Sequence, residues 1–364
     1  MEDDIDMLSD IPEALQLRIL SCLDAKQAVQ TSMLSRTWVS LWTKIPVLEF
    51  RRLSFNKLDV FNTFVNKVLC RRDHLAKLDT LKFIAHKTST QILKSVFDYA
   101  FSHGVKQLEA SIVFGGNIAW PLSVCDSLRS LKLVSWSDRI KCPFLQGSTS
   151  FKNLTVIYLK GALITDVEPF SGFPMLESLT LLSCGLCNSN KTLRIHNLRL
   201  WHLIISTGMS CMKLETPRLR FLKYRGYDFP KHEGLSVLET LVIGYWGFYN
   251  RKHIYKRQEK RVLEDLLFFF SGLHNVKSLT LYSPIALLLN FYPDELMKRS
   301  SPFRVLKNVK MEFPVHCGRA LDVCDDSCKE SAFKCVKDYL LQHVPDAEFT
   351  ITLLKADEWY DDDI

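Results

Sequence analysis

The sequence lacks the short motifs with which enzymes hold a phosphate, a zinc ion or a nucleophile. It contains no Gly-rich phosphate-binding loop, no His-Glu-x-x-His and no Gly-x-Ser-x-Gly. Cys184 and Cys187 have the spacing of a metal-binding pair, but no second pair follows nearby. A looser group of His316 with four cysteines has irregular spacing, which favours free thiols, with a zinc site as the alternative. We therefore expect no catalytic residue, no bound metal and no cofactor.

Long hydrophobic runs are also lacking. The apolar runs Leu266–Phe270 and Ile285–Phe291 are too short to span a bilayer, so we expect core segments and no membrane partner. The acidic start does not resemble a signal peptide, and the 11 cysteines are an odd number without a disulfide framework. Reduced thiols in the cytoplasm or the nucleus are the simplest interpretation. A net charge of +7 is mild for 364 residues and predicts no nucleic-acid partner.

The first fifty residues are dense in apolar side chains with helix signals between them. Ser9 or Asp10 can cap a first helix that has Pro12 in its first turn, Asp24 can cap a second, and Ser35 a third. Three short helices are too few to bury all the apolar side chains that they present, so the segment predicts a partner. The stripes lie at Ile11, Leu15, Ile19, Leu20 and Leu23 in the first helix and at Trp38, Leu41 and Trp42 in the third.

In order, these residues resemble an F-box of the plant type over residues 7–50, with Ile11 and Thr37 as departures. An ordinary N-terminal helical subdomain is the alternative. The resemblance implies docking on a Skp-family adaptor, which links the chain to a cullin and a RING subunit. The chain would then be a non-catalytic substrate receptor of a ubiquitin ligase. By motif position, the adaptor surface would comprise Leu8, Ile11, Pro12, Leu15, Ile19, Leu20, Leu23, Leu34 and Trp38.

The spacing Leu-x-x-Leu-x-Leu recurs through the rest of the chain, mostly at intervals of 19 to 27 residues. This interval is typical of leucine-rich repeats, in which each repeat gives a short strand and stacking buries the inward side chains. Combined with the first motif, it makes the chain resemble plant F-box/leucine-rich-repeat proteins. The copies begin at Leu78, Val105, Leu128, Leu154, Leu176, Ile195, Leu219, Leu238, Val276 and Leu306.

We therefore predict an α/β fold: a short all-α F-box module followed by a leucine-rich-repeat solenoid with a curved parallel sheet. The segment at 251–261 is strongly basic, and we favour the start of a helix there, with a nuclear-import signal as a further role. The expected regions are 7–50 for the F-box, 51–74 for a linker helix, 75–315 for the repeats with a basic insertion near 247–262, 316–356 for a cap with a helix at 331–343 and a strand at 349–354, and 357–364 for an acidic tail.

The residue between the last two leucines of each copy should project from the concave face of the sheet. Several of these residues are basic and have aromatic neighbours, which suits an acidic or phosphorylated protein substrate. The alternative is that exposed strand positions favour lysine for solubility. The residues predicted to bind substrate are Lys132, Tyr158, Arg199, Trp201, Lys223 and Arg225.

Two other functions remain open at this point. In the first, the chain is a non-ligase leucine-rich-repeat scaffold whose N-terminal helices merely cap the repeats. In the second, the repeats need a small molecule to complete the substrate site, although no residue set marks where it would bind. Adaptor binding separates the first alternative from the receptor hypothesis.

Overall fold

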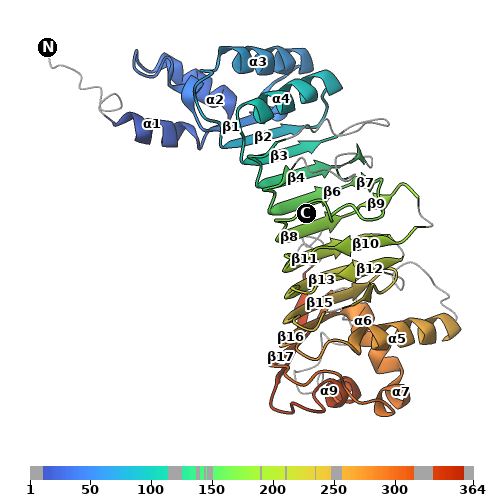
Figure 1. The fold of residues 1–364 in the computed structure, drawn as a ribbon. Helices are drawn as coiled ribbons and strands as arrows, with labels where there is room; N and C mark the ends of the chain where they lie inside the picture. Colours follow the sequence, from blue (N-terminus) through green and yellow to red (C-terminus); the bar gives the residue numbers. More distant parts are fainter. Residues whose placement is uncertain are drawn as a thin grey trace, which may run out of the picture. The chain divides into compact units, whose positions relative to one another are not determined.

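The computed structural model describes residues 11–113, 125–136, 140–142, 145, 151–188, 191–209, 211–233, 235–246, 256–314 and 331–355. The chain divides into two compact units, Met1–Thr165 and Asp166–Ile364 (Figure 1). The residues outside this description include Leu8, residues 247–255 of the predicted basic insertion, His316 with three of its four cysteines, and the acidic tail. The fourth cysteine, Cys335, is a free thiol. Among the helices that the structure describes, none combines the length and the hydropathy that crossing a membrane requires.

The first unit begins with short helices. Pro12 precedes α1 (Glu13–Leu20), and its carbonyl accepts hydrogen bonds from the backbone N–H groups of Leu15 and Gln16. Asp24 caps α2 (Ala25–Gln30) in a complete capping box with Gln27, as the spacing predicted. The expected third helix is wrong, because only two 3₁₀ turns follow, η1 (Thr31–Met33) and η2 (Leu41–Lys44).

The first unit also contains five parallel strands in the order β1-β2-β3-β4-β6, and β5 pairs with β7 in parallel apart from them. Figure 1 shows α3 and α4 together on one side of the first strands, where the two helices contact each other. The first strand lies ahead of the segment expected to be a linker, so the sheet already begins at Val47. The elements are β1 (Val47–Arg51), η3 (Arg52–Ser54), α3 (Leu58–Arg71), β2 (Thr80–Ala85), α4 (Thr90–Ser102), β3 (Gln107–Ile112), β4 (Ser130–Ser135), β5 (Ile140–Lys141), β6 (Val156–Lys160) and β7 (Ala162–Ile164).

The second unit has seven parallel strands in the order β8-β11-β13-β15-β16-β17-β18 and a smaller sheet, β10-β12-β14. Helices α5, α6, α7 and α9 follow the smaller sheet along the chain (Figure 1). The elements are β8 (Ser178–Leu182), β9 (Gly185–Leu186), β10 (Leu193–His196), β11 (His202–Ser206), β12 (Met212–Glu215), β13 (Phe221–Gly226), β14 (Lys231–His232), β15 (Thr240–Tyr245), α5 (Lys256–Phe270), β16 (Ser278–Tyr282), α6 (Ser283–Phe291), α7 (Pro293–Met297), β17 (Asn308–Pro314), α9 (Lys334–Leu340) and β18 (Glu348–Leu354).

The inward leucines of the repeats form the core, since each one pairs in register with its counterpart in the next strand. Leu81, Leu108 and Leu131 are partners in the first unit, and Leu179 and Leu203 in the second, and all are buried. Burial of a side chain of this size contributes about 1.5–3 kcal/mol, so the repeated leucines are the main stabilising force. This confirms the predicted α/β fold with a parallel sheet.

One of the ten predicted repeats has the wrong register. The copy placed at Ile195, Leu198 and Leu200 is instead Leu200-x-x-Leu203-x-Ile205, and Leu198 is 62% exposed. The cause is Asn197, whose side-chain amide donates to the carbonyls of Phe170 and Phe173 at 3.3 and 2.9 Å. Its Oδ1 accepts the backbone N–H groups of residues 199 and 200, which forms a turn before the strand.

Candidate functional site

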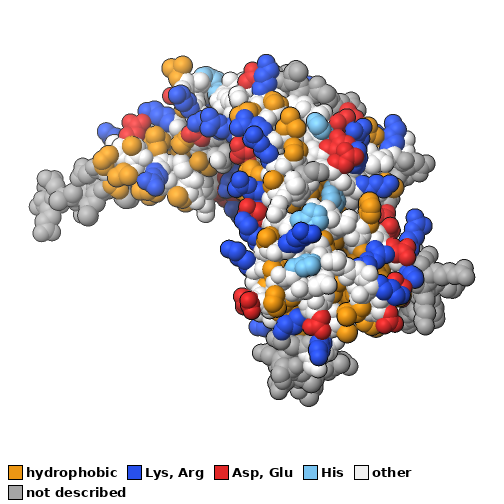
Figure 2. Space-filling model, turned by 60° about the horizontal axis from the view of Figure 1, so that its bottom comes forward, with side chains coloured by type: hydrophobic (Ala, Val, Ile, Leu, Met, Phe, Trp, Pro, Cys, Tyr) orange, Lys and Arg blue, Asp and Glu red, His pale blue; other side chains and the backbone are white. Residues whose placement is uncertain are grey.

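The helical segment of the first unit leaves large apolar side chains uncovered. On α1, Leu15 and Ile19 lie one turn apart and are 49% and 46% exposed. After α2, Leu34 is 59% and Met33 is 88% exposed. In the space-filling view, orange hydrophobic side chains gather on the helical segment that follows the grey N-terminal residues (Figure 2). This apolar surface is larger than scattered single exposures, so it is a candidate for binding a partner.

Not every residue predicted for that surface is available. Leu20 and Trp38 are buried in the core of the helical segment. The predicted apolar stripe of α1 includes residues of two faces, so Leu20 is buried whereas Leu15 and Ile19 are exposed. Ile11 and Leu23 are half-buried, and Pro12 is exposed. Met33 lies in η1, and its apolar character alone would not predict its exposure. Only the point where the helix ends, just after Gln30, decides the exposure of Met33.

A row of alternating charges crosses the strands of the first unit. Glu49, Lys82, Glu109, Lys132 and Tyr158 are register partners on successive strands. Lys132 Nζ lies 2.9 Å from Glu109 Oε1 and 5.4 Å from the centre of the Tyr158 ring. Lys82 Nζ is 4.0 Å from Glu49 Oε2. The structure therefore brings the predicted residues Lys132 and Tyr158 together, but the charge of Lys132 is balanced by Glu109 on the neighbouring strand.

The equivalent row of the second unit is less basic than predicted. Ile204, not Arg199, is the register partner of Lys223, which follows from the shifted repeat. Arg225 is 6% exposed and its guanidinium stacks on Tyr282 at 4.8 Å. Its burial makes it a structural cation of the sheet. The prediction that Arg199 and Trp201 project from the strands is wrong, because both residues precede β11.

Arg199 and Trp201 instead line an open groove of ≈ 820 Å³ in the second unit. The groove lies at the N-terminal ends of β11, β13 and β15. Two further arginines, Arg218 and Arg220, come from the turn before β13 and line the same groove. Neither arginine occupies a strand position, so the alternation of strand residues does not predict them. Two arginines at alternate positions just before a repeat strand are the sequence feature that would have indicated them.

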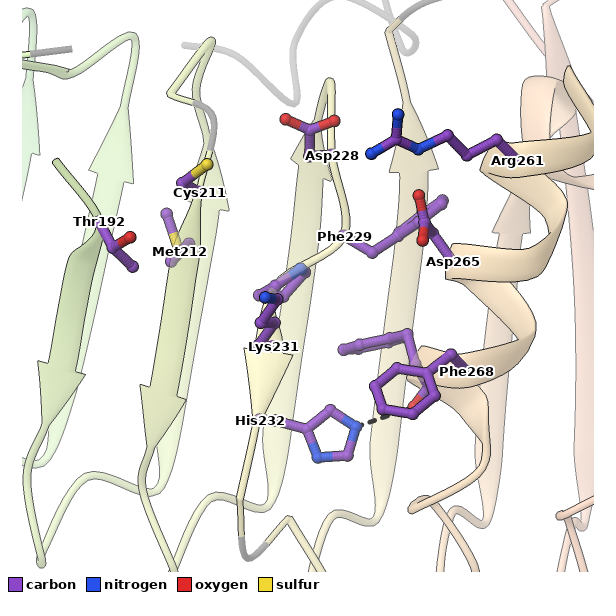
Figure 3. A pocket seen from close by; sticks show the side chains of 12 residues that line it. Thr192, Cys211, Met212, Asp228, Phe229, Lys231, His232, Arg261, Asp265 and Phe268 are labelled. Atoms are coloured by element: carbon purple, nitrogen blue, oxygen red, sulfur yellow. Dashed lines mark hydrogen bonds between the residues drawn. The ribbon is translucent and has the colours of Figure 1, made fainter. Parts of the chain in front are cut away.

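A second pocket, of ≈ 320 Å³, lies between the smaller sheet and α5 (Figure 3). Asp228 and Arg261 lie at one end of it, and His232 and Phe268 at the other. The rings of Phe229 and Phe269 stack at 6.2 Å. The Nε2 atom of His232 is 2.8 Å from the Phe269 carbonyl oxygen, which holds the strand against the helix.

The chemistry of this pocket does not resemble an active site. Figure 3 shows the Cys211 thiol far from the His232 ring, so the two cannot form a nucleophile–base pair in this arrangement. Carboxylates and cations alternate along its wall, which gives no strong net charge. The basic segment 251–261 was predicted to start this helix: residues 256–261 lie in α5, residues 251–255 lie outside the described residues, and Leu263, Leu266 and Leu267 are buried.

Glu168, His196 and Glu215 bring three possible metal-ligand atoms within 4.8 Å of one another. The carboxylate of Glu215 already binds two cations, since Arg194 Nη2 lies 3.0 Å and Lys213 Nζ 2.8 Å from Glu215 Oε1. The hydrogen bond from Lys213, with further help from Arg194, lowers the pKa of Glu215 to about 2. The group is therefore better described as an ion-pair network across β10 and β12 than as a metal site.

Comparison with known families agrees with the helical surface. Residues 8–50 match the F-box domain. These residues form an F-box. The F-box thus contains α1, α2, both 3₁₀ turns and the start of β1. Within the described part of the chain, no helix or strand covers the exposed apolar side chains of the F-box at Leu15, Ile19, Met33 and Leu34.

The chain beyond the F-box is also similar to plant proteins. An FBD-associated F-box protein of Arabidopsis thaliana is 27% identical over 301 residues, which are 76% of this chain and 65% of that protein. F-box/LRR-repeat protein 13 of the same plant is 23% identical over 363 residues, or 90% of this chain and 75% of the relative. The chain spans about half the length of the first curated relatives that it matches. It is similar to F-box/LRR-repeat proteins in both of its parts.

Proposed function

We propose that the chain is the substrate-recognition subunit of a Skp–cullin–F-box ubiquitin ligase and binds the Skp-family adaptor through its F-box. The observation that carries this proposal is the uncovered apolar surface of the F-box, where Leu15, Ile19 and Leu34 are about half exposed. Anchors at this spacing on neighbouring helical turns are those that a groove of a partner protein removes from water.

In this role the chain supplies no catalytic group. The adaptor joins it to a cullin and a RING subunit, and the repeats hold a protein substrate. Ubiquitin transfer is then accelerated by proximity, because a substrate lysine is held near the charged conjugating enzyme. The eight cysteines in the described part of the chain are all free thiols, which supports a place in the cytoplasm or the nucleus.

The test is co-purification of the chain with a plant Skp-family adaptor. We compare the wild type with Leu15→Glu/Ile19→Glu, which places two charges in the expected interface. Leu75→Glu is the matched control, since Leu75 is 93% exposed in the same unit but lies outside the F-box. We expect the double variant to lose the adaptor and the control to keep it.

Two results would contradict the proposal. The first is a wild-type chain that is folded and does not bind the adaptor. The second is an adaptor complex that survives in the double variant, which would place the interface elsewhere. The first result would favour the alternative in which the repeats act as a protein-binding scaffold outside a ligase. The second would refute only the interface at Leu15 and Ile19, because the adaptor would still be bound.

A further inference from the structure

The groove before β11, β13 and β15 has a rigid floor. The carbonyl of Glu177 accepts the N–H groups of Trp201 and His202 at 3.1 and 3.2 Å. The carbonyl of Trp201 accepts those of Arg220 and Phe221 in the same way, at 2.9 and 3.0 Å. This ladder fixes the residue before each strand at the spacing of neighbouring strands, about 4.8 Å. These backbone hydrogen bonds therefore fix the positions from which the side chains of the groove project.

The arginines of this groove differ from the lysines of the strands. Lys132 and Lys310 are each ion-paired with a glutamate of the sheet, Glu109 and Glu312, at 2.9 and 2.6 Å. Arg218 and Arg220 form no ion pair or side-chain hydrogen bond within the described part of the chain. Two uncompensated guanidinium groups thus line one open groove.

Two carboxylates also line the groove, which limits its ligands. Glu239 is paired with Lys277 at 3.1 Å, outside the groove lining, whereas Glu177 faces the groove without an ion pair in the described residues. A ligand with one negative charge would gain little against these carboxylates. A phosphate group brings about two charges and three acceptor oxygens, which match the fork of a guanidinium.

Beside the arginines the groove is apolar. Trp201 is 46% and Val237 is 41% exposed, and both line it. Phe221 stacks on His202 with 4.5 Å between the ring centres, so its face is fixed. An exposed Trp next to unpaired arginines is the composition of protein-binding hot spots.

We propose that this groove binds a segment of the protein substrate that carries phosphoserine or phosphothreonine. The phosphate lies against Arg218 and Arg220, and a neighbouring apolar side chain of the segment lies against Trp201 and Val237. Arg199, whose Nη1 contacts Met175 Sδ at 2.9 Å, borders the site. The identity of this segment as a ligase substrate rests on the function proposed above, whereas the binding chemistry does not.

The test uses the full chain, with the adaptor when it binds, and three immobilised degenerate peptide libraries. These are centred on phosphoserine, on serine and on glutamate. We expect the wild type to retain the phosphoserine library about tenfold more strongly than the others, since a charge-assisted hydrogen bond is worth about that factor. Arg218→Ala/Arg220→Ala should lose this retention, and Arg218→Lys/Arg220→Lys should keep only part of it.

Arg304→Ala/Lys334→Ala is the matched control, because it removes two exposed cations of the same unit away from the groove. It should behave as the wild type, and all variants should unfold at the wild-type temperature. The proposal is overturned if Arg218→Ala/Arg220→Ala retains the phosphoserine library, if the glutamate library binds equally, or if the wild type retains none.

Adaptor binding in the same samples separates the two proposals. A wild-type chain that binds the adaptor but does not select the phosphoserine library would refute the groove and leave the F-box function intact. A wild-type chain that selects the phosphoserine library but does not bind the adaptor would refute the F-box function and leave the groove proposal intact.

Discussion

Glu109 and Lys132 face each other across two parallel strands, with 2.9 Å between Glu109 Oε1 and Lys132 Nζ. Lys132 also lies over the ring of Tyr158. In the sequence Lys132 suggested a basic binding face, but in the structure Glu109 and Tyr158 already contact its ammonium group. The proposed substrate site therefore uses Arg218 and Arg220, which form no ion pair in the described part of the chain.

The pair between Glu109 and Lys132 should contribute little to stability. Both side chains are partly exposed, and such pairs are worth about 0.2–1 kcal/mol. We expect Lys132→Gln to lower the free energy of unfolding by less than about 1 kcal/mol, and Lys132→Glu by more, because like charges then face each other. Urea unfolding measures both. Equal stability of the two variants would show that the ion pair is not formed in solution.

The register of the shifted repeat gives a sharper prediction. Leu203 is fully buried, whereas Leu198 is 62% exposed. Leu203→Ala should destabilise the chain by about 2–5 kcal/mol through the cavity that it leaves. Leu198→Ala should change the free energy of unfolding by less than about 0.5 kcal/mol. The reverse order would restore the register that the leucine spacing predicted.

This pair of leucines also shows how far the sequence predicts the fold. The spacing places nine repeats correctly because alternate inward side chains must be apolar whatever the loops contain. It fails at Leu198 because an apolar residue happens to follow Asn197, and the turn made by the asparagine side chain decides where the strand begins. A leucine pattern carries no information on such a turn.

The candidate sites are predicted less well than the fold, for a similar reason. The stripe on α1 identifies Leu15, Ile19 and Leu20 together, but only the packing of neighbouring helices shows that Leu20 faces inward. Charge in the strands is visible in the sequence, whereas its neutralisation depends on which strands are adjacent. Arg218 and Arg220 lie in a turn, so the alternation of strand residues gives no reason to select them.

Two glycines with positive φ offer a matched test of local strain. A Cβ at Gly161 would lie 2.5 Å from the backbone oxygen of Ser135, whereas at Gly104 the nearest atom is 3.8 Å away. We expect Gly104→Ala to cost about 1 kcal/mol for its φ alone and Gly161→Ala to cost clearly more. Thermal unfolding of both variants measures the difference. Equal losses would mean that the backbone near Ser135 moves freely.

The ion pairs of Glu215 predict a dependence of stability on pH. Its pKa is lowered from 4.5 to about 2, mainly by the hydrogen bond from Lys213. A carboxylate with a lowered folded-state pKa contributes stability above its unfolded pKa and loses it as the pH falls through the folded value. Glu215→Gln should therefore be less stable than the wild type at pH 7, and the gap should close between about pH 4.5 and 2.

Denaturant midpoints at pH 7, 4 and 2.5 measure that gap. Glu264→Gln is the control, since Glu264 is exposed and forms no ion pair in the described part of the chain. Its difference from the wild type should stay small at every pH. A gap for Glu215→Gln that does not narrow on acidification would show that the carboxylate is unpaired in solution.

The cap of α2 links stability to adaptor binding. Asp24 Oδ1 accepts the Gln27 N–H at 2.8 Å, and its Oδ2 accepts the Ser54 hydroxyl at 2.9 Å. Asp24→Ala should cost about 0.5–2 kcal/mol, as the loss of an N-cap does. Because α2 lies between α1 and Leu34, the adaptor complex should dissociate at a lower temperature in this variant.

Asp24→Asn is the control, because it keeps the acceptor that caps the helix. It should recover most of the stability and most of the dissociation temperature of the adaptor complex. Circular dichroism and co-purification over a temperature series measure them, and an adaptor complex as thermally stable in Asp24→Ala as in the wild type would mean that α2 does not position the apolar anchors.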